Sequence, residues 1–271
     1  MAKQMELNSI VTQIMRVSPI NIILRVTPDG WEIPDFEAGQ FAVLYLPGSA
    51  PRCENSRPEE QEVAPDKMIR RAYSIASSSK NKEYIEFYIT LVHNGELTPR
   101  LFALNIGDRI GLATRFTGMF TLNKAPADAN IVLIATGTGV APYMSMLRSD
   151  ALAHPNRKIA VIHGARNSWD LGYSSELSLL QSIAPNFSYI PTIDHPEEEI
   201  IPWGGQKGRV QDVWKSKILD KKWNTKLTPE NTHIFLCGNP HMMDETIGIL
   251  EGEGFVEHRG KVVGQIHAEK W

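Results

Sequence analysis

The stretch that decides the fold is Ile131-Val132-Leu133-Ile134-Ala135-Thr136-Gly137-Thr138-Gly139-Val140-Ala141-Pro142. Its first five residues form a continuous apolar run of strand length, and an amphipathic pattern over Val140–Leu152 predicts a helix. A buried strand, a glycine turn and a helix in this order are typical of an open parallel sheet, which binds nucleotides at the carboxyl ends of its strands. Gly137 and Gly139 allow the backbone to approach a pyrophosphate closely. The run is not G-x-G-x-x-G, because Pro142 stands at the third glycine, so by spacing alone it is a weak signal.

The rest of the C-terminal half repeats this alternation of strand and helix. Further apolar runs predict strands at Ile159–His163, Phe187–Ile193 and His233–Cys237. Helical patterns lie at Ser175–Ile183, Val210–Leu219 and Pro240–Glu251. Strands that alternate with helices predict a parallel sheet covered on both faces.

The N-terminal half has β patterning instead. Short β-rich runs occur at Leu7–Val17, Ile20–Thr27, Gln40–Pro47, Ile69–Ala76, Tyr84–Val92 and Asp108–Thr114. Runs at this spacing predict an antiparallel barrel or sandwich. One helix is expected at Thr98–Leu104, with Thr98 as its N-cap and Pro99 at its first position.

Polar residues 123–130 break both patterns, so we expect a β-barrel domain over residues 1–125 and an α/β domain over residues 126–271. Residues 48–67 are polar and proline-containing. This composition predicts a long exposed loop, and a cover over a ligand is the alternative.

Composition excludes several classes of function. The net charge of −3 argues against a general nucleic-acid binder. Two cysteines, Cys53 and Cys237, are too few to ligate an iron–sulfur cluster and are typical of a reducing compartment. No apolar run has signal-peptide or membrane-span length, which favours the cytoplasm. The histidines lack metal-ligand spacing, and His93 and His163, at strand ends, are interpreted as structural, so no metal site is expected.

Two features of the barrel half suit a flavin nucleotide. In Arg70-Arg71-Ala72-Tyr73-Ser74, strand alternation places Arg71 and Tyr73 on one face. A guanidinium pairs with phosphate, and a phenol ring stacks on a flat heterocycle; an exposed Arg beside a half-buried Tyr is the alternative. Gly95-Glu96-Leu97-Thr98-Pro99 opens the expected helix, and a helix N-terminus can hold a pyrophosphate or be simply capped.

Two features of the second half are also informative. Phe235-Leu236-Cys237-Gly238-Asn239-Pro240 is a second strand that ends in small residues before a helix. Cys237 at that strand end either borders a cofactor cleft or is a small buried apolar residue. The chain closes on Trp271, and an aromatic side chain at a terminus needs a docking surface.

In their order, these segments resemble the bacterial type of the ferredoxin/flavodoxin–NADP reductase family. The resemblance rests on RAYSIAS, EFYITLV with NGELTPRL, ATGTGVAPYMSML, HGAR, GRV, FLCGNPHMMDE and the terminal EKW. It implies an N-terminal antiparallel barrel that holds FAD and a C-terminal parallel α/β domain that holds NADP(H), with the C-terminal tail reaching the flavin.

The resemblance also implies roles for individual residues. The expected FAD contacts are Arg71, Ala72, Tyr73, Ser74, Tyr88, Ile89, Thr90, Glu96, Leu97, Thr98, Thr138 and Trp271. The expected contacts of the nicotinamide dinucleotide are Gly137, Gly139, Ala165, Arg166, Arg209, Cys237 and Gly238. The residues expected at the reacting rings, and therefore catalytic, are Cys237, Trp271 and Ser74.

Two departures from the family pattern matter. Relatives that prefer NADP carry Ser-Arg where this chain has Asp194-His195, and an aspartate repels a phosphate but suits a ribose hydroxyl. NADP(H) is expected because Arg209 remains, and NAD(H) is the alternative. One aromatic residue of the family's tail is absent, which leaves the ring position of Trp271 open.

The implied reaction is hydride transfer from nicotinamide C4 to flavin N5, followed by single-electron transfer to ferredoxin or flavodoxin, or the reverse. The cofactor supplies this chemistry and the protein orients the rings. A monomer is the default expectation. The alternatives are an NADH-dependent flavin reductase component, an electron-transfer subunit that feeds another redox protein, and an α/β binding module without flavin.

Overall fold

The computed structural model describes residues 6–270, which form two compact units. The first comprises the chain up to Met119 together with Met144–Ser149. The second comprises Phe120–Tyr143 and the chain from Asp150 onward.

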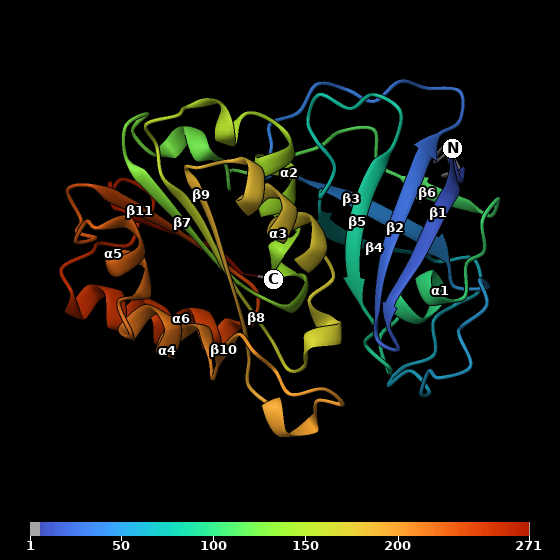
Figure 1. Cartoon of the computed structure of the whole chain (residues 1–271). Coiled ribbons are helices and arrows are strands. Elements are labelled where there is room, and N and C mark those ends of the chain that lie inside the picture. The colour runs from blue at the N-terminus through green and yellow to red at the C-terminus, as the bar shows by residue number, and fades with distance from the viewer. Residues whose placement is uncertain (1–5, 271) are drawn as a thin grey trace. The chain divides into compact units, whose positions relative to one another are not determined.

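The first unit is an antiparallel six-stranded sheet in the order β4-β3-β6-β1-β2-β5. Its elements are β1 (Ser9–Ser18), β2 (Asn21–Pro28), β3 (Phe41–Pro47), β4 (Met68–Ser74), β5 (Ile85–Thr90), α1 (Thr98–Phe102) and β6 (Arg109–Leu112). They are drawn in blue to green in Figure 1. The sheet curls so that its end strands β4 and β5 meet at an isolated bridge between Ile75 and Phe87. The antiparallel barrel is therefore confirmed.

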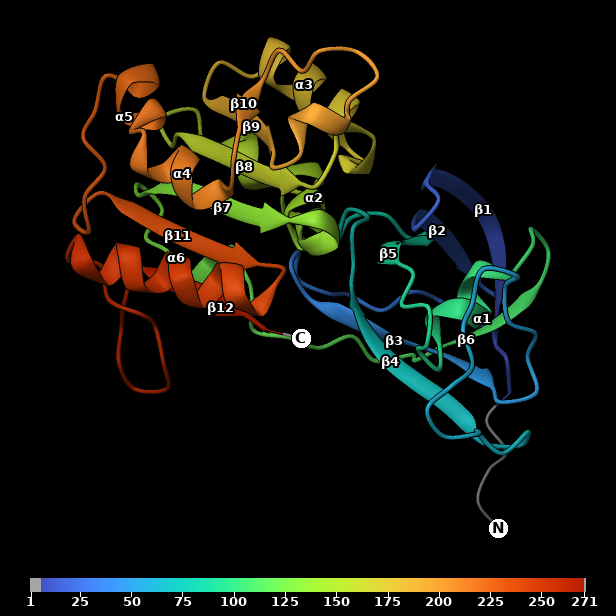
Figure 2. The ribbon, with the colours of Figure 1, turned by 90° about the horizontal axis from the view of Figure 1, so that it is seen from below.

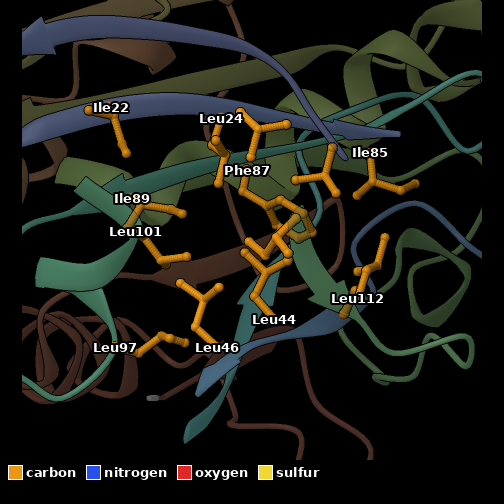
Figure 3. Close-up of a cluster of buried hydrophobic side chains, with 14 of the residues drawn as sticks. Ile22, Leu24, Leu44, Leu46, Ile85, Phe87, Ile89, Leu97, Leu101 and Leu112 are labelled. Carbon is orange, nitrogen blue, oxygen red and sulfur yellow. The ribbon is translucent and has the colours of Figure 1, made fainter. Parts of the chain in front are cut away.

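The interior of this unit is apolar and well covered. Phe87, Leu24 and Leu44 are fully buried. Figure 3 shows their side chains converging with those of neighbouring strands and of α1. Burying such side chains contributes roughly 1.5–3 kcal/mol each relative to exposure, so this cluster fixes the inward face of each strand.

The second unit is a parallel six-stranded sheet in the order β10-β9-β8-β7-β11-β12, as Figure 2 lets the reader follow. Its strands are β7 (Asn130–Thr136), β8 (Ile159–Ala165), β9 (Phe187–Ile193), β10 (Gln206–Lys207), β11 (Thr232–Cys237) and β12 (Ile266–Glu269). Its helices are α3 (Ser174–Ile183), α4 (Val210–Lys215), α5 (Ile218–Trp223) and α6 (Pro240–Gly252), and α2 (Ala141–Arg148) begins in it. Helices α4, α5 and α6 pack one apolar cluster against β7, β8 and β11, and the predicted α/β unit is confirmed.

The structure corrects several predicted element bounds. The helix expected at Val210–Leu219 is two helices, because Lys217 adopts a left-handed conformation with φ of 53° and Ser216 Oγ donates to Val213 O at 2.7 Å. The helix expected at Val140–Leu152 begins with a 3-10 turn at Gly137–Val140 and ends at Arg148. The short strands β10 and β12 were not predicted, since two to four residues give no readable period.

Residues 48–67 form neither helix nor strand, as predicted. They are nevertheless anchored, because Val63 is buried in the barrel core and Cys53 N donates to Pro99 O at 3.0 Å. Most of the segment is exposed, as predicted, and these two contacts attach it to the barrel.

Candidate functional site

The barrel's end strands β4 and β5 are joined over a short distance. Beside the Ile75–Phe87 bridge, Ala76 N donates to Glu86 O at 2.8 Å. Within residues 6–270 no ladder continues this pairing along β4 and β5. The barrel therefore closes at one end of these two strands, and the predicted FAD residues of β4 and β5 lie beyond that closure.

Arg71 and Tyr73 present different chemistry along β4. Arg71 is exposed, forms an ion pair with Glu96, and donates from Nη1 to Arg70 O at 2.7 Å. Tyr73 is half-buried, with its ring 6.3 Å from that of Phe87 in an edge-to-face arrangement. Burial raises the pKa of the Tyr73 phenol, so it stays neutral at physiological pH. The strand thus offers a cation and a neutral aromatic ring.

The turn before α1 offers backbone donors. Glu96, Leu97 and Thr98 each carry an N–H group for which the described part of the chain provides no acceptor. Successive unpaired N–H groups form a site that suits an anion. The Arg71–Glu96 ion pair joins this turn to β4, so the structure brings these predicted residues together.

The predicted N-cap role of Thr98 is wrong. Leu97 occupies the N-cap position and makes no side-chain capping bond. Thr98 Oγ1 instead accepts from Val92 N at 2.9 Å and donates to Val92 O at 3.2 Å, because the preceding turn folds back onto it. Pro99 lies in the first helical turn, as expected.

The remaining predicted FAD residues of the barrel differ in exposure. Ser74, Tyr88, Ile89 and Leu97 are buried, Thr90 is half-buried and Ala72 is exposed. Thr90 Oγ1 donates to Asn21 Oδ1 at 2.7 Å. Of this set, only the side chains of Ala72 and Thr90 have appreciable solvent exposure.

In the second unit, the strand order reverses between β7 and β11. From β7 the chain passes to β8 and β9 on one side, and later to β11 and β12 on the other. Ligands of open parallel sheets bind outside the carboxyl ends of strands at such a switch point. The glycine turns after β7 and β11 both lie at this point.

The two glycine turns are locked to each other. A Cβ at Gly139 would lie 2.3 Å from Cys237 O, and a Cβ at Gly238, whose φ is +134°, would lie 2.4 Å from Thr136 Oγ1. Thr136 Oγ1 also accepts from Asn239 N at 3.0 Å. Gly139 and Gly238 are therefore required by backbone packing between neighbouring strand ends, a reason that the sequence did not reveal.

Gly137 differs from these two glycines. Its φ is +54°, and a Cβ there would meet no atom within 4 Å, so the turn opens onto free space. Its carbonyl is held by the buried His163, whose Nε2 lies 2.9 Å from Gly137 O. Burial lowers the pKa of His163 to about 4, so the neutral ring donates from Nε2. The structural interpretation of His163 gains a definite contact.

Cys237 at the end of β11 is fully buried. Burial raises the pKa of its thiol well above the usual value, with the charge of Glu269 as a second cause. A neutral thiol is a poor nucleophile, so Cys237 can serve as a small wall residue and not as a thiolate.

The ends of β8 and β9 carry mixed charge. Arg166, which follows β8, donates from Nη2 to Glu198 Oε1 at 2.6 Å. Asp194, which follows β9, accepts from His195 Nδ1 at 2.9 Å when that nitrogen is protonated. In the backbone, His195 N donates to Arg166 O at 3.1 Å and Asp194 N donates to Ala165 O at 3.2 Å. The ends of β8 and β9 therefore lie side by side at this edge.

Two further charged groups lie near this edge of the sheet. Arg209 is exposed just before α4, and its Nη1 lies 3.7 Å from Glu245 Oε2. His195, Glu197 and Glu198 have potential ligand atoms within 4.8 Å of one another, but exposed acidic groups commonly gather without an ion, and we assign no metal there. Trp271 lies outside the described residues, and Lys270 before it pairs with Asp244.

Comparisons with known proteins agree with this division of the chain. Residues 60–117 match the model of the oxidoreductase FAD-binding domain, and residues 133–247 match that of the oxidoreductase NAD-binding domain. A flavodoxin/ferredoxin–NADP reductase of Buchnera aphidicola subsp. Baizongia pistaciae is 34% identical over 206 residues, which are 76% of this chain and 81% of the relative. The chain belongs to the flavodoxin/ferredoxin–NADP reductase family.

Other members of the reductase family support the same assignment. The Escherichia coli flavodoxin/ferredoxin–NADP reductase is 30% identical over 78% of this chain and 77% of its own length. A crystal structure of a Neisseria gonorrhoeae ferredoxin NADP+ reductase, with bound FAD and NADP, covers 97% of both chains with a TM-score of 0.78. At 24% identity that likeness shows the fold. The predicted family, its two-domain fold, and an FAD- and NAD(P)-binding oxidoreductase are confirmed.

Two side chains at the carboxyl edge of the parallel sheet make contacts that were not predicted from the sequence. Thr136 ties the β7 turn to the β11 turn, and His163 fixes the Gly137 carbonyl. Thr136 and His163 both lie at strand ends, but a threonine or a histidine at such a position has no special meaning until the neighbouring strand is known.

Among residues 6–270, no helix is both long enough and apolar enough to cross a bilayer.

Proposed function

We propose that this reductase moves electrons between NADP(H) and ferredoxin or flavodoxin through FAD bound at the β4–β5 side of the barrel. The observation that carries the proposal is the pairing, in one chain, of a cation and three unpaired amides on the barrel with an open glycine turn at the sheet's switch point. When bound, FAD supplies the means to accept a hydride as an electron pair and to exchange electrons singly.

The barrel residues have binding and orienting roles in this proposal. The donors fit a pyrophosphate, since Arg71 carries the charge and the N–H groups of Glu96, Leu97 and Thr98 are unpaired. The ring of Tyr73 offers an aromatic surface to the flavin, while Ser74, Tyr88, Ile89 and Thr90 line its edge. Ala72 contributes backbone only.

The α/β residues bind the dinucleotide in this proposal. Gly137, Thr138 and Gly139 form the turn beside its phosphates, with Gly238 and the neutral Cys237 near the nicotinamide. Ala165, Arg166 and Arg209 bind the adenosine half. Trp271 is proposed to contact the flavin. The domain limits 1–125 and 126–271 are proposed with these roles.

We further propose a cytoplasmic monomer that binds no nucleic acid and no membrane. The two described cysteines form no disulfide, which suits a reducing compartment. The net charge of −3 gives no support to a polyanion as partner.

Replacing Arg71 with glutamine is expected to weaken FAD binding about 10- to 100-fold, because a charge-assisted hydrogen bond contributes roughly 1.5–3 kcal/mol. The dissociation constant of the apoprotein for FAD, measured by flavin fluorescence, checks this. Arg70→Gln is the matched control, since Arg70 is the preceding residue on β4 and its Cζ lies 5.9 Å from the centroid of the Tyr45 ring. Equal losses in both variants would contradict the role of Arg71.

A specific observation favours NADH as a second candidate donor. Asp194, Glu197 and Glu198 follow the end of β9, and Glu198 forms an ion pair with Arg166. Acidic groups oppose a 2′-phosphate and suit a ribose diol. An NADH-dependent reductase component that feeds another redox protein is therefore the alternative function.

Replacing Asp194 with asparagine is expected to raise the ratio of kcat/KM for NADPH to that for NADH about 3- to 30-fold, since removing one repulsive contact changes binding by about 1–2 kcal/mol. Steady-state kinetics with both nucleotides measure the ratio. Glu230→Gln is the control, because Glu230 is an exposed acid at the opposite, amino end of β11. An unchanged ratio in Asp194→Asn would remove Asp194 from nucleotide selection.

A further inference from the structure

Two arginines attach the irregular 48–67 segment to the turn before α1. Arg52 donates from Nη1 to Glu59 Oε1 at 2.9 Å and to Gly95 O at 2.8 Å. Its Nη2 donates to Arg57 O at 2.6 Å. Arg52 therefore links one part of the segment to another and both to the turn.

Arg100 makes the matching contacts from α1. It is buried, and its Nη1 donates to Glu59 Oε1 at 2.5 Å and to Glu96 O at 2.6 Å. Its Nη2 donates to Gly48 O at 2.7 Å. The two guanidinium groups thus share one carboxylate oxygen, and we call Arg52, Glu59 and Arg100 the arginine clamp.

Glu59 is the carboxylate that holds the arginine clamp together. Burial acts to raise its pKa, but the hydrogen bond from Arg100 and the charges of Arg100 and Arg52 lower it below the usual value. The side chain is therefore ionised at neutral pH. Without it, two guanidinium groups that share an acceptor would repel each other at short range.

The clamp determines which way two peptide groups face. The carbonyls of Gly95 and Glu96 both accept from it. In a trans peptide the N–H of the next residue points opposite to the carbonyl. The N–H groups of Glu96 and Leu97 are consequently directed away from the clamp, and these are among the amides left without an acceptor in residues 6–270.

We propose that Glu59, acting through Arg52 and Arg100, is a positioning residue for FAD that holds the Gly95–Leu97 peptides with their N–H groups set for the pyrophosphate. The inference rests on the proposed function, which puts the pyrophosphate at this turn. The 48–67 segment then contributes to FAD binding, since it supplies Glu59 and Arg52. Preorganised donors strengthen binding because their ordering cost is met before the ligand arrives.

Glu59→Gln tests the proposal, with Glu60→Gln as the matched control, because Glu60 is exposed and accepts a hydrogen bond from the Asn94 side chain at the surface. We expect the dissociation constant for FAD to rise about tenfold in Glu59→Gln and to stay within twofold in Glu60→Gln. FMN lacks the pyrophosphate, so the loss for FMN should be smaller than that for FAD. A purely structural role would weaken both flavins equally, and that result would overturn the proposal.

Hydrogen exchange of the apoprotein gives a second measurement that needs no cofactor. The hydrogen-bonded amides of Gly95, Arg100 and Leu101, which donate to the carbonyls of Val92 and Leu97, should exchange faster in Glu59→Gln than in Glu60→Gln, while those of β1 and β2 should not change. If Glu59→Gln does not fold, Arg52→Gln carries the same tests, since Arg100 still holds Glu59. Wild-type protein that binds no FAD would refute the proposed function, whereas normal FAD binding by both Glu59→Gln and Arg52→Gln would refute only the positioning role.

Discussion

Replacing Gly139 with alanine is expected to lower the free energy of unfolding of the α/β unit by about 2–4 kcal/mol, because overpacking against rigid atoms is among the costliest single changes. The added Cβ would lie 2.3 Å from Cys237 O, 2.6 Å from Cys237 C and 2.9 Å from Gly238 Cα. All three are backbone atoms and cannot rotate away. Urea unfolding followed by tryptophan fluorescence measures the loss, since Trp214 and Trp223 are in this unit's core.

The matched control is Gly248→Ala in α6. Gly248 is exposed, and a Cβ there would meet no atom within 4 Å. Alanine is the better helix former, so this variant should gain about 1 kcal/mol. A Gly139→Ala protein as stable as wild type would show that the β7 and β11 turns do not pack as described.

Acidification is expected to destabilise the second unit through two buried histidines. Burial lowers the pKa of His163 to about 4 and that of His267 to about 3, the latter with help from the charges of His233, His258 and Lys124. Below pH 6.5 the two imidazoles bind protons in the unfolded chain but stay neutral in the folded chain. The free energy of unfolding is therefore highest above pH 6.5 and falls as the pH drops toward 4, by about 1.4 kcal/mol per pH unit for each histidine.

For His163 alone the loss at pH 4 is about 3 kcal/mol. Unfolding free energies measured from pH 7 to pH 4 check the slope. His163→Gln should flatten it while keeping an N–H that can donate to Gly137 O. His241→Gln, at an exposed position, is the control and should leave the slope unchanged. Identical slopes in wild type and His163→Gln would contradict the buried, neutral His163.

The strands of the parallel sheet were predictable from the sequence, whereas helix breaks and caps that depend on single residues were not. Apolar runs such as Ile131–Ala135 and Phe187–Ile193 predicted the parallel strands, because a strand that is buried on both faces of its sheet consists almost entirely of apolar residues. The break at Lys217 was missed, since lysine has no preference for a left-handed backbone; Trp214 and Leu219, on either side of it, are both buried in the core. Thr98 was misassigned because a nearer turn captured its hydroxyl.

The candidate site was predicted at the level of motifs. Arg71 and Glu96 were both expected near one ligand, and the structure joins them in an ion pair. The arginine clamp could not be predicted, because Glu59 lies in a segment without periodicity and its partners are 7 and 41 residues away along the chain. The packing reason for Gly139 likewise depends on β11, far from it in sequence.

The most direct test of the central claim is an anaerobic titration of the FAD-loaded reductase with NADPH, and separately with NADH, followed by the visible flavin absorption. We expect the purified protein to bind one FAD, and about one equivalent of a reduced nicotinamide dinucleotide to bleach it. Protein that takes up no FAD, or bound flavin that neither nucleotide reduces, would contradict the account.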